Sequence, residues 1–150
     1  MGESSGSEPD AFQRLADELA IRNLVARFAH LADTTPADEL DGEYMAVFTE
    51  DADASWGPIG NELRGRADIL EGAVGRRRAG ELGPGTNSRH VVTTQAVRFD
   101  GPDAAISEAY YLAINDTLAQ PNIRGIGIYR DFLRREKGSW KITSRQIIPG

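Results

Sequence analysis

The sequence predicts an α+β domain in which helices pack on one face of an antiparallel sheet. Up to residue 79, apolar residues recur mostly at helical spacing, with one short alternating stretch at 51–56. From residue 89 onward, four long segments are rich in β-branched and aromatic residues, and clusters of turn-forming residues separate them. The chain has 150 residues, which is the size of one ordinary domain.

The composition narrows the classes of function. The chain contains no cysteine, so disulfides, iron–sulfur clusters, thiolate zinc sites and a cysteine nucleophile are excluded. Its two histidines, His30 and His90, form no paired metal-binding motif, and we expect neither a metal nor a cofactor. The net charge of −6 disfavours nucleic-acid binding. No stretch approaches the ~20 consecutive apolar residues of a membrane span, so we expect no membrane partner.

The N-terminal residues 1–9 are rich in Gly, Ser and Glu, and we expect them to be disordered. The single domain then spans residues 10–150. The first ten residues have neither the basic start nor the apolar run of a signal peptide, from which we expect a cytoplasmic protein.

Asp10 is the expected N-cap of a long first helix. Along this helix the apolar face rotates, because residues 12–19 and residues 21–32 place their apolar side chains on opposite sides. Either the helix breaks near Ala20, or one straight helix is buried on different sides along its length. The second interpretation follows if the first turns pack on a partner subunit. The helix ends at residues 34–36, because a residue before proline avoids the helical conformation.

Shorter elements follow. Residues 38–48 are predicted to form a second helix, and residues 51–56 a strand with residues 52, 54 and 56 on one side. Residues 65–79 are predicted to form a third helix that ends in three consecutive arginines. The Gly-rich segment 79–88 is predicted to be a loop, and we expect it to act as a lid. The four long strands are predicted at residues 89–99, 104–115, 124–134 and 140–148.

Five segments carry a resemblance to a known family. They are IRNLVARFAHLAD (21–33), AVFTEDADASW (46–56), GRADI (65–69), SRHVVT (88–93) and IYRDFLRREKGSWKITSR (128–145). In this order and spacing they resemble the SnoaL-like branch of the nuclear transport factor 2-like (NTF2-like) superfamily, which includes scytalone dehydratase, ketosteroid isomerase, polyketide cyclases and hexachlorocyclohexane dehydrochlorinase. The resemblance covers roughly residues 11–148. It implies a cone-shaped α+β barrel, with a curved sheet and three helices around a central pocket, and a homodimer.

The resemblance also implies an acid–base pair. In the dehydratase and dehydrochlorinase members, an Asp at the end of the first helix pairs with a His at the start of the first long strand, and the matching positions are Asp33 and His90. A carboxylate bonded to one ring nitrogen fixes the tautomer and leaves the other nitrogen free as a base. On a continued ideal helix, however, Asp33 points roughly 140° away from the face that carries Phe28. Asp33 can therefore reach the pocket only if the helix ends at about Ala32.

Both residues also have ordinary structural interpretations. Asp33 is equally compatible with a capping or solvated residue at a helix end, and His90 with a strand-edge histidine bonded to the backbone. The other histidine, His30, lies opposite the Phe28 face, where a surface or dimer contact is expected. Trp140 sits in a hairpin and is expected to be structural.

Further candidates would bind substrate, and each has core packing or a surface contact as its alternative. Tyr110 and Tyr111 point to opposite sides of one strand, so at most one faces the pocket. Arg145 is a candidate for binding a carboxylate or other anion near the pocket mouth, with a surface salt bridge as the alternative. The complete set of substrate-binding candidates is Phe28, Trp56, Tyr111, Asn115, Tyr129 and Arg145.

Two departures from the dehydratase argue against the scytalone reaction itself. The Tyr that precedes the Asp in that enzyme is Ala32 here, and no histidine follows His90. The remaining hypothesis is a cofactor-independent lyase or isomerase that acts on a small hydrophobic cyclic compound, such as a polyketide, a steroid-like ketone or an aromatic intermediate. The alternative hypothesis is a non-catalytic ligand-binding or assembly module of the same fold.

Overall fold

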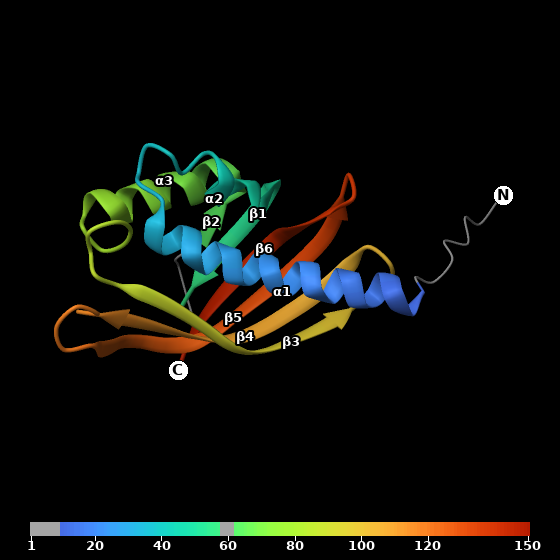
Figure 1. Ribbon diagram of the computed structural model, residues 1–150. Coiled ribbons are helices and arrows are strands. Elements are labelled where there is room, and N and C mark those ends of the chain that lie inside the picture. The colour runs from blue at the N-terminus through green and yellow to red at the C-terminus, as the bar shows by residue number, and fades with distance from the viewer. Residues whose placement is uncertain (1–9, 58–61) are drawn as a thin grey trace.

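A six-stranded curved sheet with helices on its concave side makes up the domain in this computed structural model (Figure 1). The structure describes residues 10–57 and 62–150, with the side chain of Trp56 left out. The predictions for residues 1–9 and for the Trp56 side chain lie outside this described part. The α+β class and the curved sheet are confirmed, and the sheet does not close into a barrel.

The element order is α1 (Ala11–Thr34), α2 (Glu43–Ala46), β1 (Phe48–Trp56), β2 (Glu62–Arg64), α3 (Gly65–Arg78), β3 (Arg89–Phe99), β4 (Ala104–Asn115), β5 (Asn122–Glu136) and β6 (Ser139–Pro149). The strands lie in the order β2-β1-β6-β5-β4-β3. All neighbouring strands are antiparallel except β1 and β6, which pair in parallel. The parallel pair brings the N-terminal half of the chain onto the C-terminal strand, so both halves share one core.

The first helix is continuous. Asp10 accepts a hydrogen bond from the backbone N–H of Gln13 at 2.8 Å, and the helix ends at Thr34, before the Thr35 cap and Pro36. The break near Ala20 is therefore excluded, and within the domain the helix is buried along one face, which carries Asp17, Ile21, Val25 and Phe28. The apolar side chains of its first turns remain uncovered: Phe12 is 84%, Leu15 67% and Leu19 60% exposed.

A buried carboxylate ties the first half of α1 to the β5–β6 hairpin. Asp17 is 2% exposed and accepts hydrogen bonds from Trp140 Nε1 at 3.1 Å, from an Arg135 guanidinium nitrogen at 2.7 Å and from Gln13 at 3.0 Å. Burial acts to raise the pKa of Asp17, but these hydrogen bonds outweigh it and hold that pKa below its ordinary value. Trp140 is thus structural, as the sequence predicted.

Two predicted elements differ from the structure. The predicted helix at 38–48 is reduced to the four residues of α2, because turns occupy residues 37–42 up to Gly42, a poor helix former. Because α2 ends at Ala46, β1 begins at Phe48 rather than at residue 51. Strand β2 was not predicted, because three residues are too few to show an alternating pattern.

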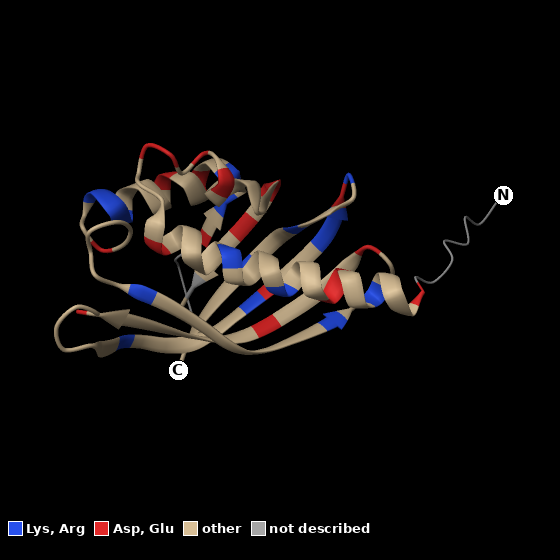
Figure 2. Cartoon of the chain, viewed as in Figure 1, with Lys and Arg blue, Asp and Glu red and all other residues tan. Residues whose placement is uncertain are grey.

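The core lies between the helices and the concave face of the sheet. It includes Ile21, Leu40, Met45 and Ile142, each 0% exposed. Acidic and basic residues are mixed along the elements, and basic residues gather at the C-terminal end of α3 (Figure 2). None of the helices in the described residues has the length and apolar character needed to cross a bilayer.

Candidate active site

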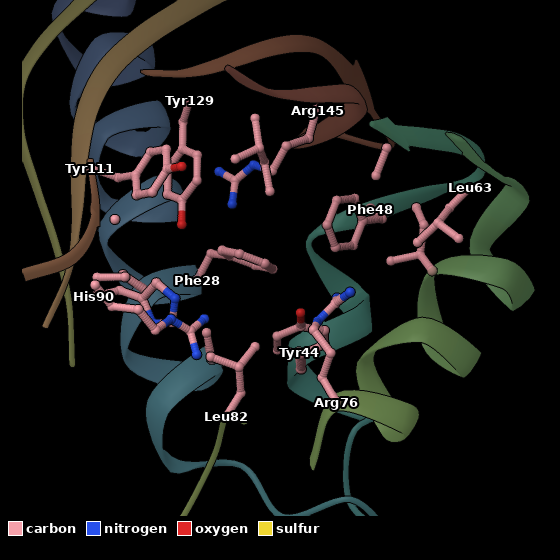
Figure 3. Close-up of a pocket in the computed structure, with 18 residues that line it drawn as sticks. Phe28, Tyr44, Phe48, Leu63, Arg76, Leu82, His90, Tyr111, Tyr129 and Arg145 are labelled. Atoms are coloured by element: carbon pink, nitrogen blue, oxygen red, sulfur yellow. The ribbon is translucent and has the colours of Figure 1, made fainter. Parts of the chain in front are cut away.

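A cavity of about 220 Å³ lies between the helices and the concave face of the sheet. Its wall is largely apolar and aromatic, and every layer of the fold contributes to it (Figure 3). The apolar and aromatic residues lining it include Phe28, Tyr44, Phe48, Leu63, Ile69, Tyr111, Tyr129 and Ile147. A cavity of this size exceeds the ~150 Å³ that holds a benzene molecule in an engineered protein core. It therefore suits a ligand of one ring or two small rings.

Asp33 and His90 meet at this cavity. The Oδ1 atom of Asp33 lies 2.7 Å from His90 Nδ1, and its Oδ2 atom accepts the backbone N–H of His90 at 3.0 Å. The Asp33 side chain is 6% exposed and that of His90 11%. Two hydrogen bonds to one carboxylate fix both the start of β3 and the plane of the imidazole ring.

The expectation that α1 must end at about Ala32 for Asp33 to reach the pocket was wrong, because α1 continues through Thr34. Near its end the helix is buried over a wide arc, and Phe28, Ala29, Leu31, Ala32 and Asp33 are all buried. The start of β3 lies on the side toward which Asp33 points. The side chain thus reaches His90 from a regular helical position, at an angle to the Phe28 face.

Arg77 secures the end of α1. Its guanidinium donates to the backbone oxygens of Thr35 at 2.7 Å and of Ala32 at 2.9 Å, and it lies 5.0 Å from the centre of the Tyr44 ring. A cation at a helix C-terminus binds the carbonyl oxygens that have no partner within the helix. This arginine was predicted only as part of a basic helix end, yet it fixes the turn that carries Asp33.

The dyad leaves one nitrogen available for chemistry. A carboxylate only accepts hydrogen bonds, so the bond to Asp33 places the ring proton on Nδ1 in the neutral imidazole. In the described part of the chain, His90 Nε2 has no hydrogen-bond partner. An unprotonated Nε2 in an apolar cavity can accept a proton from a bound molecule and return it.

A buried ion pair forms a second polar group in the wall. Arg145 Nε and Nη2 donate to the two carboxylate oxygens of Asp131 at 2.6 and 2.7 Å. Arg145 is 2% and Asp131 0% exposed. Burial acts to lower the pKa of Arg145, but the Asp131 carboxylate outweighs it and holds that pKa above its ordinary value. Arg145 therefore lines the cavity, as a substrate-binding candidate should, but neither at an exposed mouth nor in a surface salt bridge.

Tyrosines complete the polar lining. Tyr111 faces the cavity and stacks on Tyr129 with ring centres 4.4 Å apart, whereas Tyr110 is 51% exposed on the other side of β4. A Cβ atom on Gly127 would lie 2.9 Å from the Tyr111 ring, so the missing side chain there gives Tyr111 its place. Burial raises the pKa of both Tyr111 and Tyr129, which keeps their hydroxyl groups protonated as donors.

The structure also places Asn115, His30 and the predicted lid. Asn115 shares the side of Tyr111 but is the last residue of β4, and it is not among the residues that line the cavity. His30 is exposed, as predicted. In the predicted lid, Leu82 reaches the cavity wall. That the segment 79–88 moves as a lid stays a prediction.

Asp131 was not predicted as a pocket residue, although the strand pattern contained a signal for it. Tyr129, Asp131 and Leu133 alternate along β5, so a pocket-facing Tyr129 implies that Asp131 points the same way. Arg76 also lines the cavity, although the sequence predicted it only within the three arginines that end the third helix.

Comparisons with known proteins agree with this architecture. The sequence model of the SnoaL-like domain family matches residues 13–146. No curated protein sequence gives a significant match. Among solved structures, an NTF2-like protein with a cystatin-like fold from Novosphingobium aromaticivorans is similar, with a TM-score of 0.75, 21% identity and coverage of 92% of this chain and 84% of the other.

Two further structures from the same organism are similar. A candidate scytalone dehydratase has a TM-score of 0.72 and 19% identity, and the match covers 94% of this chain and 89% of the other. A candidate aromatic ring hydroxylase has a TM-score of 0.69 and 27% identity, with coverage of 90% of each chain. These likenesses confirm the predicted NTF2-like fold.

Proposed function

The chain belongs to the SnoaL-like domain family, and on that premise we propose that it is a lyase or isomerase that uses acid–base chemistry on a small hydrophobic ring compound. The observation that carries the proposal is the hydrogen-bonded pair of Asp33 and His90 at the wall of an apolar cavity. The similar structure described as a candidate scytalone dehydratase carries the name of an enzyme that eliminates water, a reaction that such a pair suits.

The proposed reaction begins with a proton transfer to His90. Nε2 takes a proton from a carbon atom of the bound ring compound, while Asp33 stabilises the resulting imidazolium through Nδ1. The same proton then returns, either to a different carbon in an isomerisation or to a departing hydroxyl group that leaves as water. In both outcomes the histidine ends in its starting state, so one dyad suffices for a full turnover.

The cavity volume narrows the substrate class. About 220 Å³ accommodates a one-ring or small two-ring compound more readily than a steroid. The stacked tyrosines and Phe28 offer flat apolar surfaces to such a ring. We therefore favour an aromatic or small polyketide-like intermediate over a steroid-like ketone.

The test is a ligand screen followed by an assay for turnover. Small cyclic ketones and alcohols are screened for compounds that raise the melting temperature, since a ligand of the folded state stabilises it by mass action. Compounds that bind are then incubated with wild type, with His90→Ala and with His30→Ala, whose exposed imidazole provides the matched control.

We expect wild type and His30→Ala to convert at least one bound compound and His90→Ala to convert none, with a melting temperature close to that of wild type. Turnover that survives in His90→Ala would contradict the proposal. If several compounds bind and none is converted by wild type, the chain is instead a ligand-binding module.

A further inference from the structure

The buried ion pair of Arg145 and Asp131 occupies the cavity wall away from the dyad. Figure 3 shows the Arg145 guanidinium beside the Tyr129 ring, with His90 on a different side of the space around Phe28. The centre of the guanidinium lies 4.2 Å from the Phe28 ring centre and 4.5 Å from that of Tyr129. Two aromatic faces and one carboxylate thus hold this cation in a single orientation.

One donor of this group is unused. Nε and Nη2 bind Asp131, whereas the buried Nη1 has no hydrogen-bond partner in the described part of the chain. The Tyr129 hydroxyl likewise has none there. A buried donor without an acceptor is costly, so such donors are normally satisfied by water or by a ligand. An oxygen atom of a bound molecule can accept a hydrogen bond from such a donor.

The charge of the site decides which kind of oxygen fits. Asp131 cancels the positive charge of Arg145, so the pair as a whole is neutral and 0–2% exposed. A carboxylate ligand would add an uncompensated negative charge to an apolar cavity, which burial strongly disfavours. A ketone or phenol oxygen is neutral when it binds and adds no such charge. Because Arg145 is still a cation, it can stabilise partial negative charge that grows on that oxygen.

We infer that Asp131 sets the charge preference of the cavity: by neutralising Arg145 it makes the site select neutral oxygen-bearing rings, whose oxygen lies beside Arg145, and reject carboxylates. Asp131 acts through Arg145 and is a positioning residue. The inference deepens the proposed function, because its ligand occupies the same cavity as the proposed substrate. In the proposed reaction, the electron pair released when His90 removes a proton next to the carbonyl moves to the oxygen held by Arg145.

The test compares two probes with the same ring, acetophenone as the neutral ligand and benzoate as the anion. Isothermal titration calorimetry measures both affinities for wild type, Asp131→Asn and Glu108→Gln. Asn keeps an acceptor for Arg145 but removes the negative charge. Glu108 pairs with Arg130 at 2.6 Å across β4 and β5 in a half-exposed position, so its variant is the control for losing one carboxylate.

For wild type and Glu108→Gln we expect acetophenone to bind at least tenfold more tightly than benzoate. For Asp131→Asn the ratio should shift toward benzoate by at least tenfold, because Arg145 then carries an unpaired positive charge. A folding defect alone would weaken the binding of both probes and would not change the ratio of their affinities.

Two results would overturn the inference. The first is that wild type binds benzoate and acetophenone with equal affinity. This comparison tests the inference even if Asp131→Asn does not fold. The other is a folded Asp131→Asn protein with an unchanged ratio. A different result would contradict the proposed function alone. If wild type prefers acetophenone but converts no ring compound, the inference on charge preference stands and the proposed enzymatic activity does not.

Discussion

Replacing Asp33 by Asn tests the dyad without needing the substrate. In wild type, one carboxylate oxygen faces His90 Nδ1 and the other accepts the backbone N–H of the same residue. The amide side chain of the Asp33→Asn variant has only one oxygen. If that oxygen keeps the backbone N–H, the amide NH₂ group faces Nδ1 and donates to it. The ring proton must then move to Nε2, which removes the proposed base while the local hydrogen bonds persist.

The size of the effect follows from the two bonds. Hydrogen bonds to charged groups contribute about 1.5–3 kcal/mol and neutral ones about 0.5–1.5, so two bonds that lose their charge cost about 2 kcal/mol of unfolding free energy. For a chain of this length, that lowers the melting temperature by roughly 4–8 °C. A positioned general base contributes about 10²–10⁴-fold to a rate. The loss of turnover should therefore greatly exceed the loss of stability.

The assay is ¹⁵N NMR of the imidazole nitrogens at a pH where both rings are neutral. The chain has only two histidines, so the exposed His30 is an internal reference. We expect His90 to carry its proton on Nδ1 in wild type and on Nε2 in Asp33→Asn, and the exposed Asp38→Asn control to match wild type. An unchanged tautomer in Asp33→Asn, or a change equally present in Asp38→Asn, would refute the reasoning.

Three more predictions concern the scaffold. The lowered pKa of Asp17 means that the stability it contributes is complete at neutral pH and lost as pH falls below about 4, so urea unfolding of Asp17→Asn should vary less than that of wild type between about pH 5 and pH 2. Arg77→Met should lose about 2–3 kcal/mol of unfolding free energy through its bonds to the end of α1, whereas the more exposed Arg78→Met should lose less than about 0.5. We also propose that a second copy covers the exposed apolar turns of α1; light scattering should then give a dimer for wild type and a monomer for a Leu15→Ser, Leu19→Ser double variant, and equal masses would contradict this.

The long strands were predictable because their pattern is local. The predicted bounds 89–99 and 104–115 agree with β3 and β4, since alternation and the turn residues between them mark both ends. The pairing of β1 with β6 is not local. It joins residues about ninety positions apart, such as Ala54 and Arg145, and no periodicity in either segment encodes the partner.

The contact between Asp33 and His90 could be predicted only in part from the sequence. Asp33 and His90 are 57 residues apart, and helical geometry alone argued against their contact. The resemblance of the surrounding segments predicted that the two side chains meet, because it carries information on how α1 lies against β3. Helical geometry alone does not show that the last turns of α1 are enclosed from several directions, so that Asp33 is buried although it lies off the main apolar face.

Arg145 shows how one extra residue can move a side chain from the surface to the site. Trp140 and Ile142 face the core, and strict alternation along β6 would next turn Ser144 inward and leave Arg145 outside. The ladder with β5 slips at this point, because Leu133 pairs with Ile142 and Phe132 with Ser144. This bulge leaves Thr143 without a partner in the ladder, and its hydroxyl bonds to the Phe132 carbonyl oxygen at 3.1 Å. The alternation reverses after it, so Arg145 turns inward to meet Asp131. A polar anchor in an otherwise apolar cavity thus depends on an irregularity that binary patterning of the strand is unable to show.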